Sequence, residues 1–366
     1  MSDHSTKSIR GDLPSNVSRP AMVRVSAAYG AVEFFERQGL DPDVILQTVQ
    51  LRREELTDPI GQLSLHQYCW MFEVAAEHAK CTSLGLEYGA AFLPQHLGYV
   101  GYLAVTAPIL GRALRCLANE LPFHQQGSFM SLDSYGASQL ALSYEITDAN
   151  VRNKRQDAEL TLACMLNLLR QPLGASWSPT EVHFTHSRWG SALPYQRVFG
   201  TAVRFQEETN RIVFPKSLLN APMPRRDDAL HGLLAAEIAR QKGAQRYDPD
   251  ILARVRYQIE RLLPRGVCDL DRVSLACNLP SWSVKRKLRA RGLSFQDLLV
   301  TVRREMAQAY LVERRMPATE VALSLGYSEL SAFSRAFRQW TGLTPREYVR
   351  CATDKSEPHD SSNIGS

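Results

Sequence analysis

The chain has 366 residues, of which 44% are hydrophobic and 22% charged, a balance that excludes a largely disordered or fibrous protein and leaves room for two domains with a core each. The net charge of +5 is unevenly distributed, because residues 250–350 carry 18 Lys and Arg against 10 Asp and Glu while the rest of the chain is slightly acidic. A basic region of this kind is expected in a domain that binds a polyanion.

The seven cysteines form no CxxC pair and no regular spacing, which favours a reduced protein over a disulfide-bonded secreted one. Residues 1–20 are polar and lack the apolar segment of a signal peptide. No apolar run approaches the roughly twenty residues that span a bilayer. We therefore predict a cytoplasmic protein with no membrane association, and a disordered N-terminus over residues 1–20.

Apolar residues recur at helical spacing from residue 25 onward. Asp41 stands where an N-cap belongs, with proline at the first helical position, and Ser64 precedes a longer predicted helix over residues 65–80. Another helix is predicted over residues 109–120. The first 120 residues are thus expected to be mainly helical.

The period changes near residue 129. Alternating apolar residues over 129–146, around a turn at residues 133–136, predict a β-hairpin. A helix is predicted over 153–169, followed by strands over 181–185 and 211–214. Helices, hairpin, helix and strands in this order predict an α+β domain with an antiparallel sheet, over residues 21–242.

A predicted helix over residues 230–242 leads into a polar segment at 243–250 that ends in Asp-Pro-Asp, which we interpret as the linker between domains. A second domain is predicted over residues 251–351. The remainder, 352–366, is polar and is predicted to be a disordered tail.

Two copies of a helix-turn-helix pattern follow the linker. In the second copy, residues 318–325 and 330–340 each carry an apolar face at helical spacing, and Gly-Tyr-Ser at 326–328 interrupts the pattern. The first copy, over residues 270–292, turns at Asn-Leu-Pro instead. A continuous helix over 294–315 joins them, and about twenty helical residues span about 30 Å, close to one turn of B-DNA. The second domain is therefore predicted to be all-α.

The second helix of each copy leaves polar and cationic residues on its outer face, where they could contact phosphates and base edges in a DNA major groove. An ordinary solvated helix face is the alternative for either copy taken alone. Trp282 could pack on sugar or thymine methyl groups, or fold back against the linking helix. The candidate DNA-binding residues are Trp282, Ser283, Lys285, Arg286, Arg289, Ser331, Ser334, Arg335 and Arg338.

The double pattern resembles the AraC/XylS family of bacterial transcription regulators, above all in the string ALSLGYSELSAFSRAFRQWTGLTPREY over residues 322–348. The first copy departs from the family pattern at Ser274, Asn278 and Trp282, which puts the sequence of its DNA half-site in doubt. The resemblance implies a sequence-specific regulator that binds double-stranded promoter DNA. It further implies an activator that works with RNA polymerase.

The first domain resembles the arabinose-binding-type N-terminal domain of one branch of these regulators, through GYVGYL at 98–103, RQD at 155–157, VFG at 198–200 and VRF at 203–205. The resemblance implies a unit that senses a small-molecule effector and forms a homodimer, and it does not imply a sugar. We expect a metabolite such as an amino acid, an amine or another carboxylate. Candidate pocket residues surround the most glycine-rich part of the domain, although each could be an ordinary core or surface residue: His96, Tyr99, Tyr102, Phe123, His124 and Phe129.

The helix predicted over residues 153–169 has an apolar side that could pair across a two-fold axis. The candidate dimerisation residues on it are Leu160, Cys164 and Leu168. The alternative function is a constitutive DNA-binding regulator whose first domain only dimerises or binds a protein partner.

No catalytic motif accompanies these patterns: the sequence has no Walker loop, GxSxG, HExxH or GxGxxG after a strand. His183 and His186 could suggest a metal site, but a separation of three on a strand places them on opposite faces. A DNA-modifying enzyme of this family would need a nucleophilic cysteine in a Pro-Cys-His-Arg-type context, which the sequence does not contain. We expect no catalytic residues, no metal and no cofactor.

Overall fold

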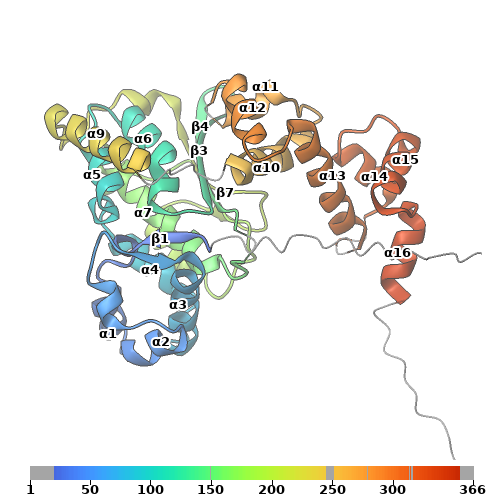
Figure 1. Cartoon of the computed structure of the whole chain (residues 1–366). Coiled ribbons are helices and arrows are strands. Elements are labelled where there is room, and N and C mark those ends of the chain that lie inside the picture. The colour runs from blue at the N-terminus through green and yellow to red at the C-terminus, as the bar shows by residue number, and fades with distance from the viewer. Residues whose placement is uncertain are drawn as a thin grey trace, which may run out of the picture. The chain divides into compact units, whose positions relative to one another are not determined.

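The computed structural model describes residues 20–148, 150–244, 251–277, 279–312, 314 and 316–354. The chain divides into two compact units (Figure 1): the first comprises residues 1–126, 131–144 and 150–231, and the second residues 127–130, 145–149 and 232–366. The predicted disordered segments at 1–20 and 352–366 lie outside the described residues, apart from Pro20 and residues 352–354. Residues 245–250 of the predicted linker lie outside them as well.

The first unit opens with short helices and continues into a sheet and one long helix. Its elements in chain order, with 3-10 helices marked η, are β1 (Met22–Arg24), η1 (Val25–Ala28), α1 (Ala31–Arg37), α2 (Pro42–Thr48), η2 (Arg53–Leu56), β2 (Gln62–Ser64), α3 (Leu65–His78), α4 (Leu84–Ala91), η3 (Pro94–Leu97), α5 (Tyr99–Val105), α6 (Leu110–His124), β3 (Ser128–Tyr135), β4 (Gln139–Ile146), α7 (Arg155–Leu173), β5 (Glu181–His183), α8 (Leu193–Phe199), β6 (Val203–Arg204), β7 (Asn210–Pro215) and η4 (Lys216–Asn220). Helix α9 (Asp228–Ala244) begins in this unit and ends in the second.

Five strands form the larger sheet, in the order β3-β4-β7-β5-β6. The predicted hairpin is present as β3 and β4, and Gly136, at φ +66°, follows β3 in a left-handed conformation that glycine adopts without strain. Strand β7 pairs antiparallel with both β4 and β5. Strand β6 was not predicted and pairs parallel with β5, so the sheet is mixed rather than wholly antiparallel. Strand β6 has only two residues, too few to show the alternation of apolar and polar residues from which a strand is predicted.

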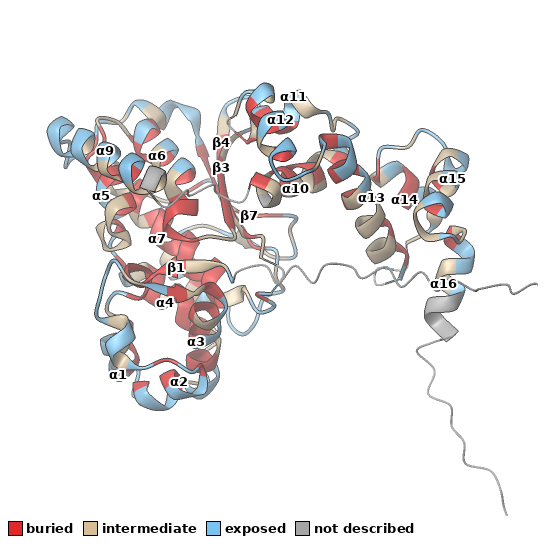
Figure 2. Cartoon of the chain, viewed as in Figure 1, coloured by how far each residue is buried: buried red, intermediate tan, exposed pale blue. Residues whose placement is uncertain are grey.

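Helix α7 is the central helix of the first unit, and Figure 2 shows it buried along most of its length. Helix α4 packs against it across two glycines. A Cβ atom at Gly85 would lie 2.3 Å from the carbonyl oxygen of Gln156, and one at Gly89 would lie 2.2 Å from that of Leu160. Any larger residue would collide with the backbone of α7, so these glycines set how closely the two helices approach.

The carbonyl groups at the end of α4 are held by one side chain of α7. The amide nitrogen of Asn167 donates to the carbonyl oxygens of Gly89, Ala90 and Phe92 at 2.9–3.1 Å. The last carbonyls of a helix have no partner within the helix, and burying them unpaired is costly. Asn167 therefore ends α4 and fixes it on α7.

The second unit is helical from α9 onward, as predicted, and it also contains the start of β3 and the end of β4. Its elements after α9 are α10 (Ile251–Leu262), η5 (Leu263–Arg265), α11 (Leu270–Ala276), α12 (Ser281–Arg289), α13 (Phe295–Val312), α14 (Ala318–Ser324), α15 (Leu330–Thr341) and α16 (Pro345–Asp354). One apolar core runs through it, with Val284, Val302, Phe333 and Phe337 fully buried. Helix α13 packs on α10, α14, α15 and α16, and α10 in turn on α11 and α12, so both helix-turn-helix units share this core.

Candidate nucleic-acid interface

The first helix-turn-helix is formed by α11 and α12. The side chain of Asp269 accepts the amide hydrogen of Arg272 and so caps the start of α11. Helix α12 begins at Ser281, directly after Pro280, whose extended backbone ends the turn. The hydroxyl of Ser281 donates to Asp271 of α11.

The second helix-turn-helix is formed by α14 and α15, with residues 325–329 between them. Gly326 has φ +75°, a conformation that L side chains rarely adopt, which explains the glycine at this turn. Phe333 and Phe337 point into the core and contact each other with ring centroids 5.6 Å apart. The opposite face of α15 is left to solvent, as the apolar period predicted.

Most candidate DNA-binding residues lie on the outer faces of α12 and α15, which we call the recognition helices. Lys285, Arg286, Arg289, Arg335 and Arg338 are exposed. Ser331 is exposed as well, and its hydroxyl donates to Glu329, while Ser334 is half-buried.

Ser283 is the exception among the candidates on α12. It is 7% exposed and lies next to buried Val284, so it faces the core and is not available to DNA. The apolar stripe of α12 is only Val284 and Leu288, which is too short to fix the helix rotation closely, and the prediction placed Ser283 on the wrong side.

Trp282 points to solvent. Its side chain is 62% exposed, and the guanidinium of Arg286, one turn along α12, lies 5.1 Å from the ring centroid. A cation over an aromatic face is attracted by the ring quadrupole. The indole ring of Trp282 therefore presents a flat apolar surface beside the cationic face of the recognition helix.

Each helix-turn-helix is held by an arginine from a supporting helix, a feature that sequence reasoning missed. Arg254 of α10 donates to the carbonyl oxygen of Cys277, and Arg303 of α13 donates to that of Leu325 at 3.1 Å. Cys277 and Leu325 are the C-caps of α11 and α14, the same position in the two copies. The guanidinium of Arg303 also lies 5.1 Å from the ring centroid of Tyr327.

Some cations of the second unit support the fold, through ion pairs, as Arg256 does with Glu260 and Glu305, or through bonds to carbonyl oxygens. Five of the six cations on the recognition helices lie within ion-pair distance of no carboxylate in the described part of the chain: Lys285, Arg286, Arg289, Arg335 and Arg338. Unpaired surface cations on two helices of one core suit a polyanion such as DNA.

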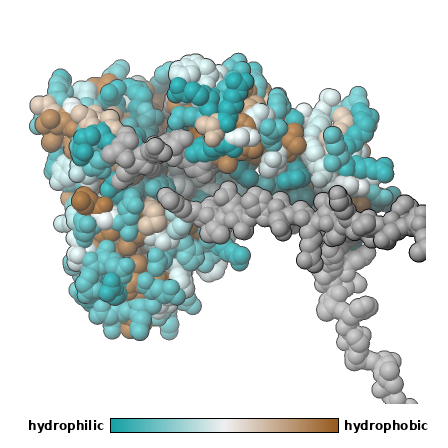
Figure 3. Space-filling model, in the orientation of Figure 1, coloured by the Kyte–Doolittle hydropathy of each residue, from teal (hydrophilic) through white to brown (hydrophobic). Residues whose placement is uncertain are grey.

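Exposed apolar side chains are dispersed over both units. The face in view in Figure 3 is mostly hydrophilic, with apolar residues in small patches. Leu275 of α11 and Leu323 of α14 are exposed at equivalent positions of the two copies. Nothing in the structure shows what covers them, and single exposed leucines are common on protein surfaces.

The six candidate pocket residues do not come together around one cavity. A cavity of 740 Å³, which we call the α1 cavity, is lined by residues of η1, α1, η2, α4 and η3, and His96 is the only one of the six among them. Phe123, His124 and Phe129 are buried elsewhere, and Tyr102 is 47% exposed. Tyr99 begins α5 and is half-buried outside the cavity.

The candidate dimerisation residues lie in the interior of the first unit. Leu160, Cys164 and Leu168 are 6%, 4% and 1% exposed on α7. Leu160 sits against Gly89 of α4, so this apolar side is packed within the chain. Pairing of two copies through these residues would require the unit to open, so their burial contradicts the predicted dimerisation role.

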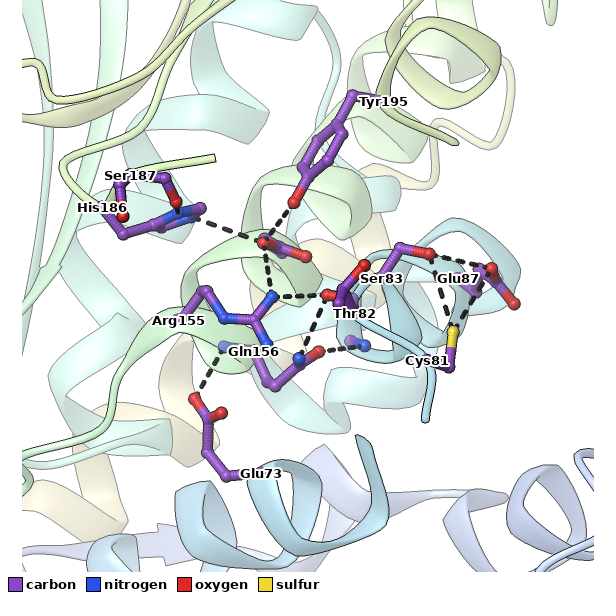
Figure 4. A network of polar contacts seen from close by, with 12 residues as sticks. Glu73, Cys81, Thr82, Ser83, Glu87, Arg155, Gln156, His186, Ser187 and Tyr195 are labelled. Atoms are coloured by element: carbon purple, nitrogen blue, oxygen red, sulfur yellow. Dashed lines mark hydrogen bonds and ion pairs between the residues drawn. The ribbon is translucent and has the colours of Figure 1, made fainter. Parts of the chain in front are cut away.

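A polar network joins the beginning of α7 to neighbouring segments (Figure 4). Glu159 Oε1 accepts the hydroxyl hydrogen of Tyr195 at 2.7 Å and lies 3.4 Å from Arg155 Nη1 and 3.5 Å from His186 Nε2. Arg155 also donates to the carbonyl oxygen of Thr82. Burial raises the pKa of Glu159 to about 7.

The other residues of the RQD string have equally specific partners. The Gln156 side chain accepts the amide hydrogen of Gly85 at 2.6 Å, at the start of α4. Asp157 accepts the hydroxyl hydrogen of Tyr144 at 2.6 Å, and the Tyr144 oxygen accepts from Gln125 at 2.6 Å. Burial raises the pKa of Asp157 to about 7, against the lowering effect of the Tyr144 hydrogen bond.

The raised pKa of Asp157 predicts a pH-dependent cost of burying this carboxylate. Between about pH 4 and pH 7 the folded chain binds the proton and the unfolded chain does not, so this group's contribution to stability falls as pH rises and stays low above pH 7. Asp157→Asn keeps the group neutral. We expect the free energy of unfolding of the variant to rise relative to wild type by on the order of 2 kcal/mol between pH 5 and pH 8.

Urea unfolding at the two pH values measures this difference. Asp58→Asn, at an exposed aspartate, is the matched control and should follow wild type at both pH values. A constant difference between Asp157→Asn and wild type across this pH range would show that Asp157 is already ionised in the folded chain.

The two histidines considered as metal ligands have different partners. His183 is buried at the end of β5, where its Nε2 lies 2.7 Å from Glu181 and its Nδ1 accepts from Arg211 at 3.0 Å. His186 lies beyond the strand, next to Glu159. Among the described residues, no three His, Cys, Asp or Glu side chains are grouped so as to hold a metal ion.

The six cysteines whose side chains are described are free thiols. Cys351, the seventh, lies outside the described side chains. No helix in the described part of the chain has both the length and the apolar character needed to cross a membrane.

Two family models match the chain. One, described as the arabinose-binding domain of AraC transcription regulator, N-terminal, matches residues 39–223, which is half of the chain. The other, a helix-turn-helix domain, matches residues 274–350 and so includes both recognition helices.

Relatives match over nearly their whole length. The chain is 26% identical over 329 residues to the HTH-type transcriptional regulator VirS of Mycobacterium tuberculosis, covering 90% of this chain and 96% of the relative. It is 26% identical over 340 residues to the ornithine utilization regulator of Pseudomonas aeruginosa, covering 89% and 96%. The solved structure of the regulator CdpR from Pseudomonas aeruginosa is 18% identical, with a TM-score of 0.38 over 87% of this chain and 98% of that one. The family models, the two helix-turn-helix units and the named relatives together place the chain in the AraC family of DNA-binding transcription regulators, and not among the enzymes.

Proposed function

We propose that this regulator binds promoter DNA as a homodimer in the cytoplasm, activates transcription by working with RNA polymerase, and responds to a small-molecule effector held by its first unit. The observation that carries the proposal is the pair of recognition helices, each with unpaired cations, built on one core. The α1 cavity supports the effector role, because its 740 Å³ lies within the roughly 300–1,000 Å³ of small-molecule sites.

The effector is proposed to be an amino acid, an amine or another carboxylate. The ornithine utilization regulator, a relative over 89% of this chain, is named for an amino acid with a second amine. The surface that pairs two copies lies outside the buried side of α7, because Leu160, Cys164 and Leu168 are enclosed within one chain.

Transcription in vitro from promoters next to the regulator's own gene tests the proposal. The full chain should bind one of these promoters in preference to unrelated DNA, and RNA synthesis should rise when a metabolite extract is added. Specific binding with the same RNA yield with and without metabolites would support the constitutive alternative. Lower RNA synthesis on binding would identify a repressor.

A further inference from the structure

We propose that the α1 cavity is the effector site and that it takes a small zwitterion, a compound with one ammonium and one carboxylate group, of which a free L-amino acid is the simplest. The inference rests on the proposed function for its regulatory meaning. The site itself is argued from the cavity walls.

Five of the residues that line the cavity carry aromatic rings. The rings of Tyr29 and His96 lie 4.3 Å apart, Phe92 lies 5.3 Å from His96, and Tyr88 lies 5.5 Å from Phe92 and 5.2 Å from Phe34. Burial lowers the pKa of His96, which favours the neutral ring. Aromatic faces attract an ammonium group as well as apolar stems, so this lining does not oppose a cation.

Ser26 lines the cavity and is 4% exposed. Its Oγ is buried beside Gly98, where an added Cβ would lie 3.3 Å from it, so this hydroxyl is not counted among the groups that the cavity presents to a ligand.

The cavity also presents one anion and one cation that no ion pair engages. Glu33 and Arg37 are four residues apart on the same side of α1 and both line the cavity, yet neither lies within ion-pair distance of an opposite charge among the described residues. Arg53, the other cavity arginine, is bonded to Asp43 at 2.6 Å and to Glu36 at 3.2 Å. Glu33 is thus suited to an ammonium group and Arg37 to a carboxylate.

A sugar fits these walls less well. A pentose carries several hydroxyl groups that each need a partner on binding, and two hydroxyls of the cavity are already used within the protein. Tyr88 donates to the carbonyl oxygen of Tyr29 at 2.8 Å, and Thr57 to that of Glu54 at 2.7 Å. The groups that the cavity presents to a ligand are the charged side chains of Glu33 and Arg37 rather than a set of hydroxyl partners.

Thermal unfolding of the full chain with each of the twenty L-amino acids, L-ornithine and L-arabinose tests the site. At about a hundred times its dissociation constant, at least one amino acid should raise Tm by a few degrees. The amine obtained by removing its carboxylate, and the acid lacking its amine, should bind at least about tenfold more weakly, because each leaves one charge of the cavity unpaired.

Variants locate the binding. Glu33→Gln and Arg37→Gln replace exposed charges without touching the core, and each should weaken binding about tenfold or more, measured by calorimetry. Glu77→Gln on α3 and Arg115→Gln on α6 remove exposed charges outside the cavity and should bind as wild type does.

Stabilisation by none of the amino acids, or by arabinose instead, would overturn the ligand class. Equal affinity of Glu33→Gln, Arg37→Gln and wild type would overturn the site. These outcomes are distinct from failure of the proposed function, in which an amino acid binds the cavity but changes neither promoter binding nor transcription. Conversely, a compound that gates transcription with unchanged affinity in both charge variants would contradict only the site.

Discussion

Replacing Arg335 and Arg338 of α15 together by alanine is expected to lower the affinity for promoter DNA at least about 30-fold. Both side chains are exposed one turn apart on the recognition helix, and neither lies within ion-pair distance of a carboxylate among the described residues. Each arginine that contacts a base edge contributes about 1–3 kcal/mol, and the fold loses nothing because Phe333 and Phe337 hold the opposite face.

Fluorescence anisotropy on promoter and unrelated DNA, at several salt concentrations, separates the kinds of contact. Loss confined to the promoter would identify base contacts. Equal loss on both DNAs, with the salt slope reduced by about 1 for each residue, would identify phosphate contacts. Arg115→Ala, at an exposed arginine of the first unit, is the control and should bind as wild type does. Wild-type affinity of the double variant would mean that α15 does not face DNA.

Gly89→Ala is expected to destabilise the first unit by about 3 kcal/mol or more, although it adds a single methyl group. The new Cβ would lie 2.2 Å from the carbonyl oxygen and 2.7 Å from the Cα of Leu160, so α4 and α7 would have to separate. Separation would also disturb the hydrogen bonds from Asn167 to the end of α4. Urea unfolding measures the loss, and hydrogen–deuterium exchange of α4 and α7 locates it.

Gly232→Ala is the matched control, because it makes the same change inside α9, where an added Cβ meets nothing within 4 Å. Alanine is the better helix former there, so this variant should equal wild type or exceed its stability by up to about 1 kcal/mol. Wild-type stability and exchange in Gly89→Ala would show that α4 and α7 are not in backbone contact.

The helix-turn-helix units could be predicted from sequence because the spacing of apolar residues in an amphipathic helix shows which face is buried. The spacing of Val321, Phe333 and Phe337 placed them inside, and all three are fully buried. The glycine at 326 marked a turn that requires a positive φ. Where the stripe was short, as in α12, the rotation was wrong and Ser283 was placed outside.

The first unit was less predictable because its key contacts join distant segments. Helix α7 was predicted to have one apolar side, yet Gln156, Asp157 and Glu159 are buried too, since their partners come from α4, β4 and α8. The α1 cavity was hard to predict for the same reason. Its walls combine residues of η1 and α1 with residues of α4 and η3 that lie some sixty positions later in the sequence. The glycine-rich segment did not predict the position of the cavity, and His96 is the only one of the predicted pocket residues that lines it.

Hydroxyl-radical footprinting of the full chain on its promoter tests most directly whether both helix-turn-helix units read DNA. Helix α13 has 18 residues, about 27 Å in length, and joins the two units. The account predicts two protected stretches on one face of the duplex about one helical turn apart, with the second lost in the Arg335 and Arg338 double variant. A single protected stretch, or equal protection of unrelated DNA, would contradict it.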